Sequence, residues 1–260
     1  MSRSACKRIP LLAIAVGIAI FTNCAFAANA SSDEGHHWNY SGETGPAHWG
    51  DLSPEYAACS QGKQQSPVNI RHARHAKLPI IEFDYKPSAV DVINNGHTIE
   101  STYDPGSSIT IDGKTYELVQ FHFHHVSENT VNRKHFPLEG HLVHKNADGK
   151  LAVVAVFFEE GHTNPAIATV WNNMPNTEGQ ENKPSGVQVN ASQLLPDDRE
   201  YYRFSGSLTT PPCTEGVTWL VMAHKMSVSK EQVAAFAALD PNDYRPVQRL
   251  NGRKIEEGGK

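Results

Sequence analysis

The chain has 260 residues, enough for one sizeable domain. Hydrophobic residues make up 39% and charged residues 20%, with 19 Gly and 16 Pro, so collagen, a coiled coil and wholesale disorder are excluded. The net charge of −5, from 28 acidic and 23 basic residues, argues against a nucleic-acid-binding protein.

The first element is a secretory signal peptide, predicted for residues 1–27 with cleavage near Ala27. Three basic residues precede the apolar run Ile9–Phe21, and small residues follow it up to the cleavage site. The run is shorter than the roughly 20 residues that cross a bilayer, which weighs against a membrane anchor. A lipoprotein attached through Cys24 is the other alternative. Residues 28–260 would then form the mature, exported domain.

Cleavage changes the charge and the cysteine content of the chain. It removes three of the 23 basic residues and no acidic residue. The mature chain then has 20 basic and 28 acidic residues, which gives a net charge of −8. Of the 4 cysteines, Cys59 and Cys213 remain. An oxidising compartment favours a disulfide between them, and two buried thiols are the alternative. The chain-entropy model gives such a bridge about 5 kcal/mol of stabilisation.

Strand signals dominate the mature chain. Tight hairpins are predicted around Asn-Gly at 95–96 and Asp-Gly at 112–113, since both positions of such a turn need positive φ. The unbroken apolar run Leu151–Phe158 is typical of a strand buried on both faces, and Val217–Ala223 is a further candidate. No internal repeat or linker divides the chain, so a single domain is expected.

Helices are expected to be few and short. Ser53 and Asn164 are each followed by proline, which is typical of a helix N-cap with proline at the first helical position. The strongest helix signal follows Ser229, which forms a capping box with Gln232. The architecture predicted from these patterns is a large β-sheet with short helices around it.

Two histidines alternate with phenylalanines in the segment 120–124. On a strand, His122 and His124 share one face while the phenylalanines point the other way. His141 is a third candidate ligand, because the loop 126–137 would return the chain as an adjacent strand. Three neutral imidazoles favour zinc and leave a fourth tetrahedral position open for water.

A repeated spacing supports this metal site. A zinc-bound histidine normally donates its other ring N–H to an acceptor that fixes its orientation. Gln120 lies two residues before His122, and Glu139 lies two residues before His141, each on the face of its ligand. The alternative is that exposed strand histidines alternate with aromatic residues without binding a metal.

Seven sequence blocks together resemble the α-class carbonic anhydrases. The blocks are residues 37–40, 65–70, 94–97, 120–124, 139–144, 207–213 and 244–246. They occur in the family's order over nearly the whole mature chain. The resemblance implies a mainly β domain (α+β in some schemes) around a ten-stranded, mostly antiparallel twisted sheet with short peripheral helices. Export and the cysteine pair make the chain most similar to the bacterial periplasmic branch, which implies a periplasmic location.

The resemblance implies that the chain catalyses the reversible hydration of carbon dioxide to bicarbonate and a proton, with Zn²⁺ as the cofactor. By analogy, Thr209 accepts a hydrogen bond from a zinc hydroxide and donates a hydrogen bond to Glu128. These two hydrogen bonds aim a lone pair of the hydroxide at the substrate carbon. The resemblance also assigns a set of residues to the substrate pocket: Val143, Val153, Leu208, Thr210, Val217 and Trp219.

Each turnover releases a proton, and the resemblance assigns its transfer to His97, with Tyr40 and Asn95 ordering the intervening water. Histidine suits the task because its ordinary pKa is about 6.5. Two residues depart from the family pattern. Glu100 stands where some members have Asn along the polar side of the cleft, which would alter the water network. Asp243 stands where Asn is frequent; because the family uses the backbone carbonyl there to hold the second histidine, we expect this side-chain change to matter little.

The expected partners are the small molecules carbon dioxide and bicarbonate, with no nucleic acid, no membrane after signal cleavage, and a monomer or homodimer. A non-catalytic zinc-binding or recognition module of the same fold is one alternative, and a zinc-storage protein is another. The complete set of chemical residues favours catalysis over recognition. Ligands on strands rather than in a flexible tract weigh against storage.

Overall fold

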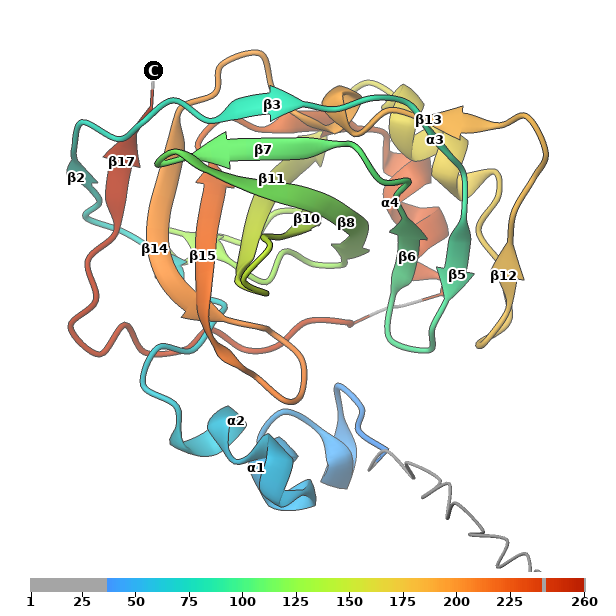
Figure 1. Cartoon of the computed structure of the whole chain (residues 1–260). Coiled ribbons are helices and arrows are strands. Elements are labelled where there is room, and N and C mark those ends of the chain that lie inside the picture. Colours follow the sequence, from blue (N-terminus) through green and yellow to red (C-terminus); the bar gives the residue numbers. More distant parts are fainter. Residues whose placement is uncertain (1–36, 240–241, 260) are drawn as a thin grey trace, which may run out of the picture. The chain divides into compact units, whose positions relative to one another are not determined.

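A strongly twisted β-sheet of thirteen strands organises the residues that the computed structural model describes, 37–239 and 242–259 (Figure 1). Ten of these strands follow one another in the order β12-β5-β6-β8-β10-β11-β15-β14-β17-β2, and β3, β7 and β16 join beside that path. Nine pairings in the sheet are antiparallel and three are parallel. The mainly β fold is confirmed, with slightly more strands than the ten expected.

The elements of the described residues are short except in the centre of the sheet. The sheet strands are β2 (Arg74–His75), β3 (Glu82–Asp84), β5 (Val92–Asn94), β6 (Ile99–Thr102), β7 (Ser108–Ile111), β8 (Lys114–His124), β10 (Leu138–Lys145), β11 (Leu151–Glu160), β12 (Glu181–Asn182), β14 (Tyr201–Ser207), β15 (Glu215–Met222), β16 (Met226–Val228) and β17 (Glu256–Gly258). Two small sheets pair β1 (Asn69–Ile70) with β9 (Thr130–Val131) and β4 (Ser88–Ala89) with β13 (Gln188–Val189). The α-helices are α1 (Trp49–Leu52), α2 (Ala58–Gln61), α3 (Pro165–Trp171) and α4 (Lys230–Ala237).

Both predicted hairpins are present, but their turns differ. Asp112 and Gly113 have φ of 51° and 69°, so the β7–β8 turn has the positive φ predicted for both positions. Between β5 and β6 only Gly96 has positive φ, at 81°, so the expectation for Asn95 was wrong. The Asn95 side chain instead accepts the backbone N–H groups of His97 and Thr98, and this replaces a two-residue turn by a longer capped one.

The predicted helix starts are confirmed. Asn164 caps α3 by accepting the N–H of Ile167, and Ser229 forms the expected capping box with Gln232 at the start of α4. Ser53 also caps as expected, but the segment that follows, Pro54–Tyr56, is a single 3₁₀ turn.

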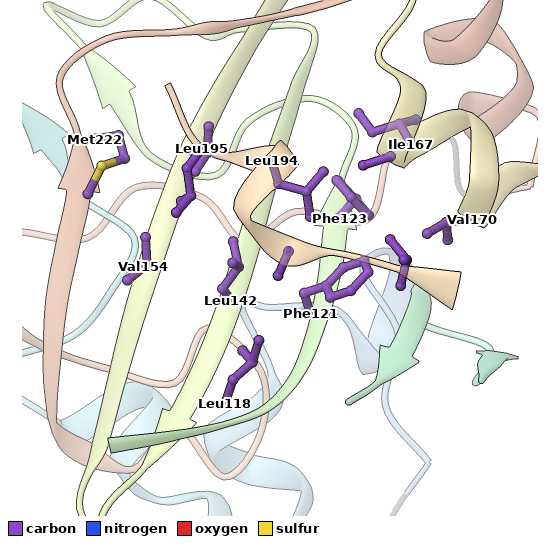
Figure 2. Close-up of a cluster of buried hydrophobic side chains, with 14 of the residues drawn as sticks. Leu118, Phe121, Phe123, Leu142, Val154, Ile167, Val170, Leu194, Leu195 and Met222 are labelled. Atoms are coloured by element: carbon purple, nitrogen blue, oxygen red, sulfur yellow. The ribbon is translucent and has the colours of Figure 1, made fainter. Parts of the chain in front are cut away.

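The centre of the sheet is apolar on both faces, which explains the unbroken apolar run in β11. Val154 and Val156 pack into one core cluster, whereas Val153 and Ala155 pack into the other. The first cluster contains Phe121, Phe123 and Leu142 from the neighbouring strands (Figure 2). The second cluster shares its face of the sheet with the candidate metal ligands.

A disulfide joins Cys59 to Cys213, whose Cα atoms lie 5.0 Å apart. The predicted bridge is therefore present, and the alternative of two thiols is wrong. The predicted signal peptide, residues 1–27, lies outside the described residues, so its cleavage and the boundary of the mature domain stay predictions. No helix within residues 37–239 and 242–259 is long and apolar enough to cross a membrane.

Candidate metal centre

The ladder between β8 and β10 brings the three predicted histidines together. The two strands are antiparallel, and His141 lies directly opposite His122. Because side chains alternate along a strand, His122 and His124 project from the same face of β8. The intervening Phe123 is buried in the core on the other face. The loop after β8 thus returns the chain as the adjacent strand, as the sequence predicts.

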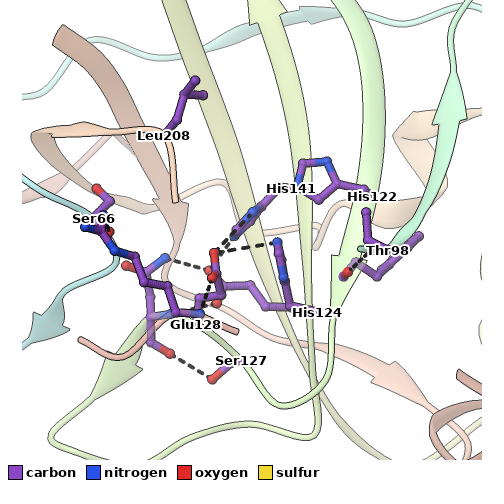
Figure 3. Close-up of polar contacts among 12 residues, drawn as sticks. Ser66, Thr98, His122, His124, Ser127, Glu128, His141 and Leu208 are labelled. Atoms are coloured by element: carbon purple, nitrogen blue, oxygen red, sulfur yellow. Dashed lines mark hydrogen bonds and ion pairs between the residues drawn. The ribbon is translucent and has the colours of Figure 1, made fainter. Parts of the chain in front are cut away.

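The three imidazole rings form a closed group, which Figure 3 shows beside Glu128. Their ring centroids are 5.1 Å apart for His122 and His124, 5.3 Å for His122 and His141, and 4.7 Å for His124 and His141. One nitrogen from each ring lies within 4.8 Å of the others. That spacing suits a single ion, since nitrogen–zinc bonds are about 2.0–2.1 Å long.

Each ring has a polar partner at the nitrogen that is not available to a metal. His122 Nδ1 donates to Gln120 Oε1 at 2.8 Å, and His124 Nδ1 donates to the backbone carbonyl of Asp243 at 2.6 Å. His141 Nε2 lies 3.1 Å from Glu139 Oε1. These contacts leave Nε2 of His122, Nε2 of His124 and Nδ1 of His141 for a metal. The structure therefore places Gln120 and Glu139 where the spacing predicted them.

Burial keeps these imidazoles uncharged at neutral pH. It lowers the pKa of His122 well below 6.5, and it lowers the pKa of His141 to about 4. Burial also lowers the pKa of His124, although Glu128 opposes this effect. Within the described residues, His124 Nε2 is buried and has no hydrogen-bond partner. Three neutral imidazole nitrogens, one of them buried without a hydrogen-bond partner in the described residues, fit zinc as the bound ion.

Glu128 lies fully buried next to this group. Its Oε1 accepts the backbone N–H of Arg245 at 2.8 Å. Its Oε2 lies 3.6 Å from His124 Nε2 and 4.0 Å from His141 Nδ1, without a hydrogen bond from the described residues. Thr209 is also buried, and no hydrogen bond joins it to Glu128 in residues 37–239 and 242–259. The predicted link between the two side chains therefore stays a prediction.

The predicted apolar wall lies on the same face of the sheet. Val153, Val217 and Trp219 are buried in the second core cluster, and Val143 and Leu208 pack against it. The Trp219 ring meets the His141 ring edge-on at 5.0 Å, which joins the wall to the metal ligands. Thr210 is half-buried in the loop after β14.

His97 is not part of the metal group. Its ring stacks on that of Trp38, with centroids 3.7 Å apart and planes 11° apart. It is half-buried, and partial burial lowers its pKa from 6.5. Tyr40 packs edge-on against Trp38 at 5.3 Å, so the predicted water-ordering residue lies near the same aromatic group.

The sequence patterns assigned no role to two residues that support the site, Asn129 and Arg245. Asn129 donates to Glu139 twice, from its backbone N–H at 2.8 Å and from Nδ2 at 2.7 Å, and so holds the carboxylate behind His141. Arg245 holds Glu128 through its backbone N–H. Asn129 lies in a loop and Arg245 beside a proline, and neither position carries a periodic pattern that would have identified it.

Comparisons with known proteins agree with this geometry. The model of the eukaryotic-type carbonic anhydrase family matches residues 44–258. A carbonic anhydrase of Pectobacterium carotovorum is 46% identical over 242 residues, which cover 92% of this chain and 98% of that protein. The structure of a hyperthermostable carbonic anhydrase from an active hydrothermal vent chimney matches with a TM-score of 0.82 and 50% identity, over 85% of this chain and 99% of that one. The α-carbonic anhydrase from Thermovibrio ammonificans, solved with the inhibitor sulfanilamide, gives 0.83 and 46% over the same shares.

Proposed function

This chain belongs to the eukaryotic-type, or α-class, carbonic anhydrase family, and we propose that His122, His124 and His141 bind the zinc ion that it uses. Its activity is the reversible hydration of carbon dioxide to bicarbonate and a proton. The observation that carries the zinc proposal is the convergence of three ring nitrogens within 4.8 Å on one face of the sheet.

The chemistry needs a strong oxygen nucleophile at neutral pH. Bound zinc supplies it by acidifying water, a property for which carbonic anhydrases are the standard example. Neutral imidazole ligands leave the charge of the cation uncompensated, whereas thiolates or carboxylates would offset it. Gln120, Glu139 and the carbonyl of Asp243 hold the three rings in their orientations.

Glu128 and Thr209 would orient the nucleophile. Because the backbone N–H of Arg245 donates to Oε1 of Glu128, Oε2 is the oxygen left to accept a hydrogen bond from the Thr209 hydroxyl. Thr209 would then present its own oxygen as an acceptor to the O–H of the nucleophile. This arrangement admits a nucleophile that carries one proton and directs its lone pair toward the substrate.

The apolar wall would receive the substrate. Carbon dioxide is small and uncharged, so it gains little from polar groups and is bound best by a dry surface next to the nucleophile. Val143, Leu208 and Trp219 would supply this surface together with the buried valines of β11 and β15, and Thr210 would stand at its rim.

The test combines metal analysis with stopped-flow hydration of carbon dioxide. We expect about one zinc ion per chain in the wild type, and loss of both zinc and activity in His141→Ala. His72→Ala, at an exposed histidine, is the control and should keep both. Wild-type protein that holds zinc without hydrating carbon dioxide would favour the binding or storage alternatives.

We assign proton transfer between the site and solvent to His97. Support comes from its stack on Trp38, which holds the ring in place, and from the turn at Asn95, which fixes the backbone on which it stands. In weak buffer, His97→Ala should lower kcat on the order of 10²-fold and leave kcat/KM for carbon dioxide unchanged. Added imidazole should restore the rate of the variant. An unchanged kcat would assign the transfer to another group.

We propose a periplasmic location and a monomeric or homodimeric state. The support is the signal-like composition of residues 1–27 and the disulfide, which persists in oxidising compartments. N-terminal sequencing of the protein from a periplasmic fraction should begin near residue 28. Light scattering of that material gives the oligomeric state.

A further inference from the structure

Two of the candidate zinc ligands have a carboxylate next to the ring, and the third has a carboxylate behind its amide partner. Glu139 lies 3.1 Å from His141 Nε2, and Asp243 Oδ2 lies 3.7 Å from His124 Nδ1. Behind His122 stands the neutral amide of Gln120, whose Nε2 in turn donates to Glu100 Oε2 at 3.1 Å. Glu139 was predicted from its spacing. Glu100 and Asp243 are the two positions at which the sequence departs from the family pattern.

Asp243 holds its carboxylate at His124 through two other contacts. Its backbone carbonyl accepts the ring N–H of His124, and its Oδ1 accepts the backbone N–H of His125 at 2.6 Å. The side chain is only 3% exposed. An asparagine in the same place would keep the contact with His125 through its carbonyl oxygen. The atom turned toward His124 would then be either an amide donor or a neutral oxygen, so the negative charge would be lost.

Glu100 reaches its ligand through one intermediate. It lies on β6 directly opposite His122 of β8, and it is half-buried. The Gln120 amide bridges the two residues, because its oxygen accepts from His122 while its nitrogen donates to Glu100. A negative acceptor for the amide N–H polarises the amide and makes its oxygen a stronger acceptor for the ring N–H.

We propose that Glu100 and Asp243 are positioning residues that, together with Glu139, form an outer ring of carboxylates and strengthen the retention of zinc by this chain. An anion behind the donor of a ligand imidazole raises the basicity of the coordinating nitrogen, and partners of this kind typically change metal affinity 10–100-fold. The inference rests on the proposed zinc site. It also replaces the expectation that the side chain of Asp243 matters little.

The first measurement is the zinc dissociation constant of the folded protein, by competition with a chelator. The variants are Glu100→Gln, Asp243→Asn and the double variant, each of which removes a charge with little change in shape. We expect about tenfold weaker binding for Asp243→Asn and a smaller loss for Glu100→Gln, which acts through Gln120. The double variant should bind zinc more weakly than either single variant, because the two carboxylates stand behind different histidines. Glu82→Gln, at an exposed residue of β3, is the control.

Two further readouts distinguish positioning from a structural role. In the zinc-loaded protein, NMR of the imidazole N–H groups should show a shift of the His124 resonance in Asp243→Asn and of the His122 resonance in Glu100→Gln. Zinc-free variants should unfold at the same denaturant concentration as the zinc-free wild type. Zinc affinity within twofold of the wild type in the double variant would overturn the inference. So would a loss of affinity matched by an equal loss of stability of the zinc-free protein. Wild-type protein that binds no zinc at these histidines would instead overturn the proposed function.

Discussion

His144 is a fully buried histidine that the catalytic proposal does not use. It lies on β10, and its Nε2 is 2.7 Å from the hydroxyl of Tyr85, whose ring it stacks against at 5.8 Å. Burial lowers the pKa of His144 to about 3. Since an unfolded histidine has a pKa of about 6.5, the unfolded chain takes up the proton first as the pH falls. The stability associated with this residue is complete above about pH 6.5 and is lost as the pH falls toward 3.

We therefore predict that His144 contributes to acid destabilisation. Between pH 7 and pH 5 it should lower the free energy of unfolding by about 2 kcal/mol. His144→Gln removes the titrating group. Between pH 7 and pH 5, the free energy of unfolding of this variant should therefore fall by about 2 kcal/mol less than that of the wild type. Denaturant unfolding at the two pH values measures the difference, with exposed His162→Gln as the control. Equal pH dependence in wild type and His144→Gln would contradict the prediction.

At the scale of the elements, Gln232 links the two longer helices. Besides closing the capping box with Ser229, its Oε1 accepts the backbone N–H of Asn164 at 2.9 Å, and its Nε2 donates to the carbonyl of Asn164 at 2.8 Å. Asn164 is itself the N-cap of α3. One buried amide therefore stabilises the first turn of α4 and the entry into α3.

Substitution of Gln232 should lower the free energy of unfolding more than substitution of Ser229, its partner in the capping box. Ser229→Ala removes one capping bond and should lower the free energy of unfolding by about 1 kcal/mol. Gln232→Ala also leaves the buried backbone N–H of Asn164 unpaired, at a cost of about 1–3 kcal/mol, whereas the carbonyl of Asn164 still accepts the N–H of Ala168. Urea unfolding of both variants gives the comparison. Equal losses would show that the bonds to Asn164 add nothing.

The sequence predicted elements whose causes are local. The turn at 112–113, the capping box and the alternating histidines each depend on residues within a few positions of one another. The parallel pairing of β11 with β15, and of β17 with β2, joins segments far apart in the sequence, so no local pattern indicates it. The role of the Asp243 carboxylate was not predicted for the same reason, since Asp243 lies 119 positions from His124.

Across the whole molecule, the disulfide ties two distant segments to the site. Cys213 lies in the loop between β14 and β15 that carries Thr209, and its carbonyl accepts the side-chain N–H of Gln65 at 3.0 Å. The carbonyl of Cys59 accepts a hydrogen bond from Nη2 of Arg245 at 2.8 Å, and the backbone N–H of Arg245 donates to Oε1 of Glu128. The bridge thus connects the supports of the two residues proposed to orient the nucleophile.

Removal of this bridge should therefore affect both stability and catalysis. The cysteines are 154 positions apart, so the chain-entropy model gives a loss of up to about 5 kcal/mol in the free energy of unfolding. In the double variant Cys59→Ser, Cys213→Ser, the loop carrying Thr209 loses its anchor while the three histidines keep theirs. We expect kcat to fall and zinc content to stay near one ion per chain. Denaturant unfolding, metal analysis and stopped-flow kinetics measure the three quantities. A reducing agent should destabilise the wild type and leave the variant unchanged; a variant as stable and as active as the wild type would show that packing alone holds this loop.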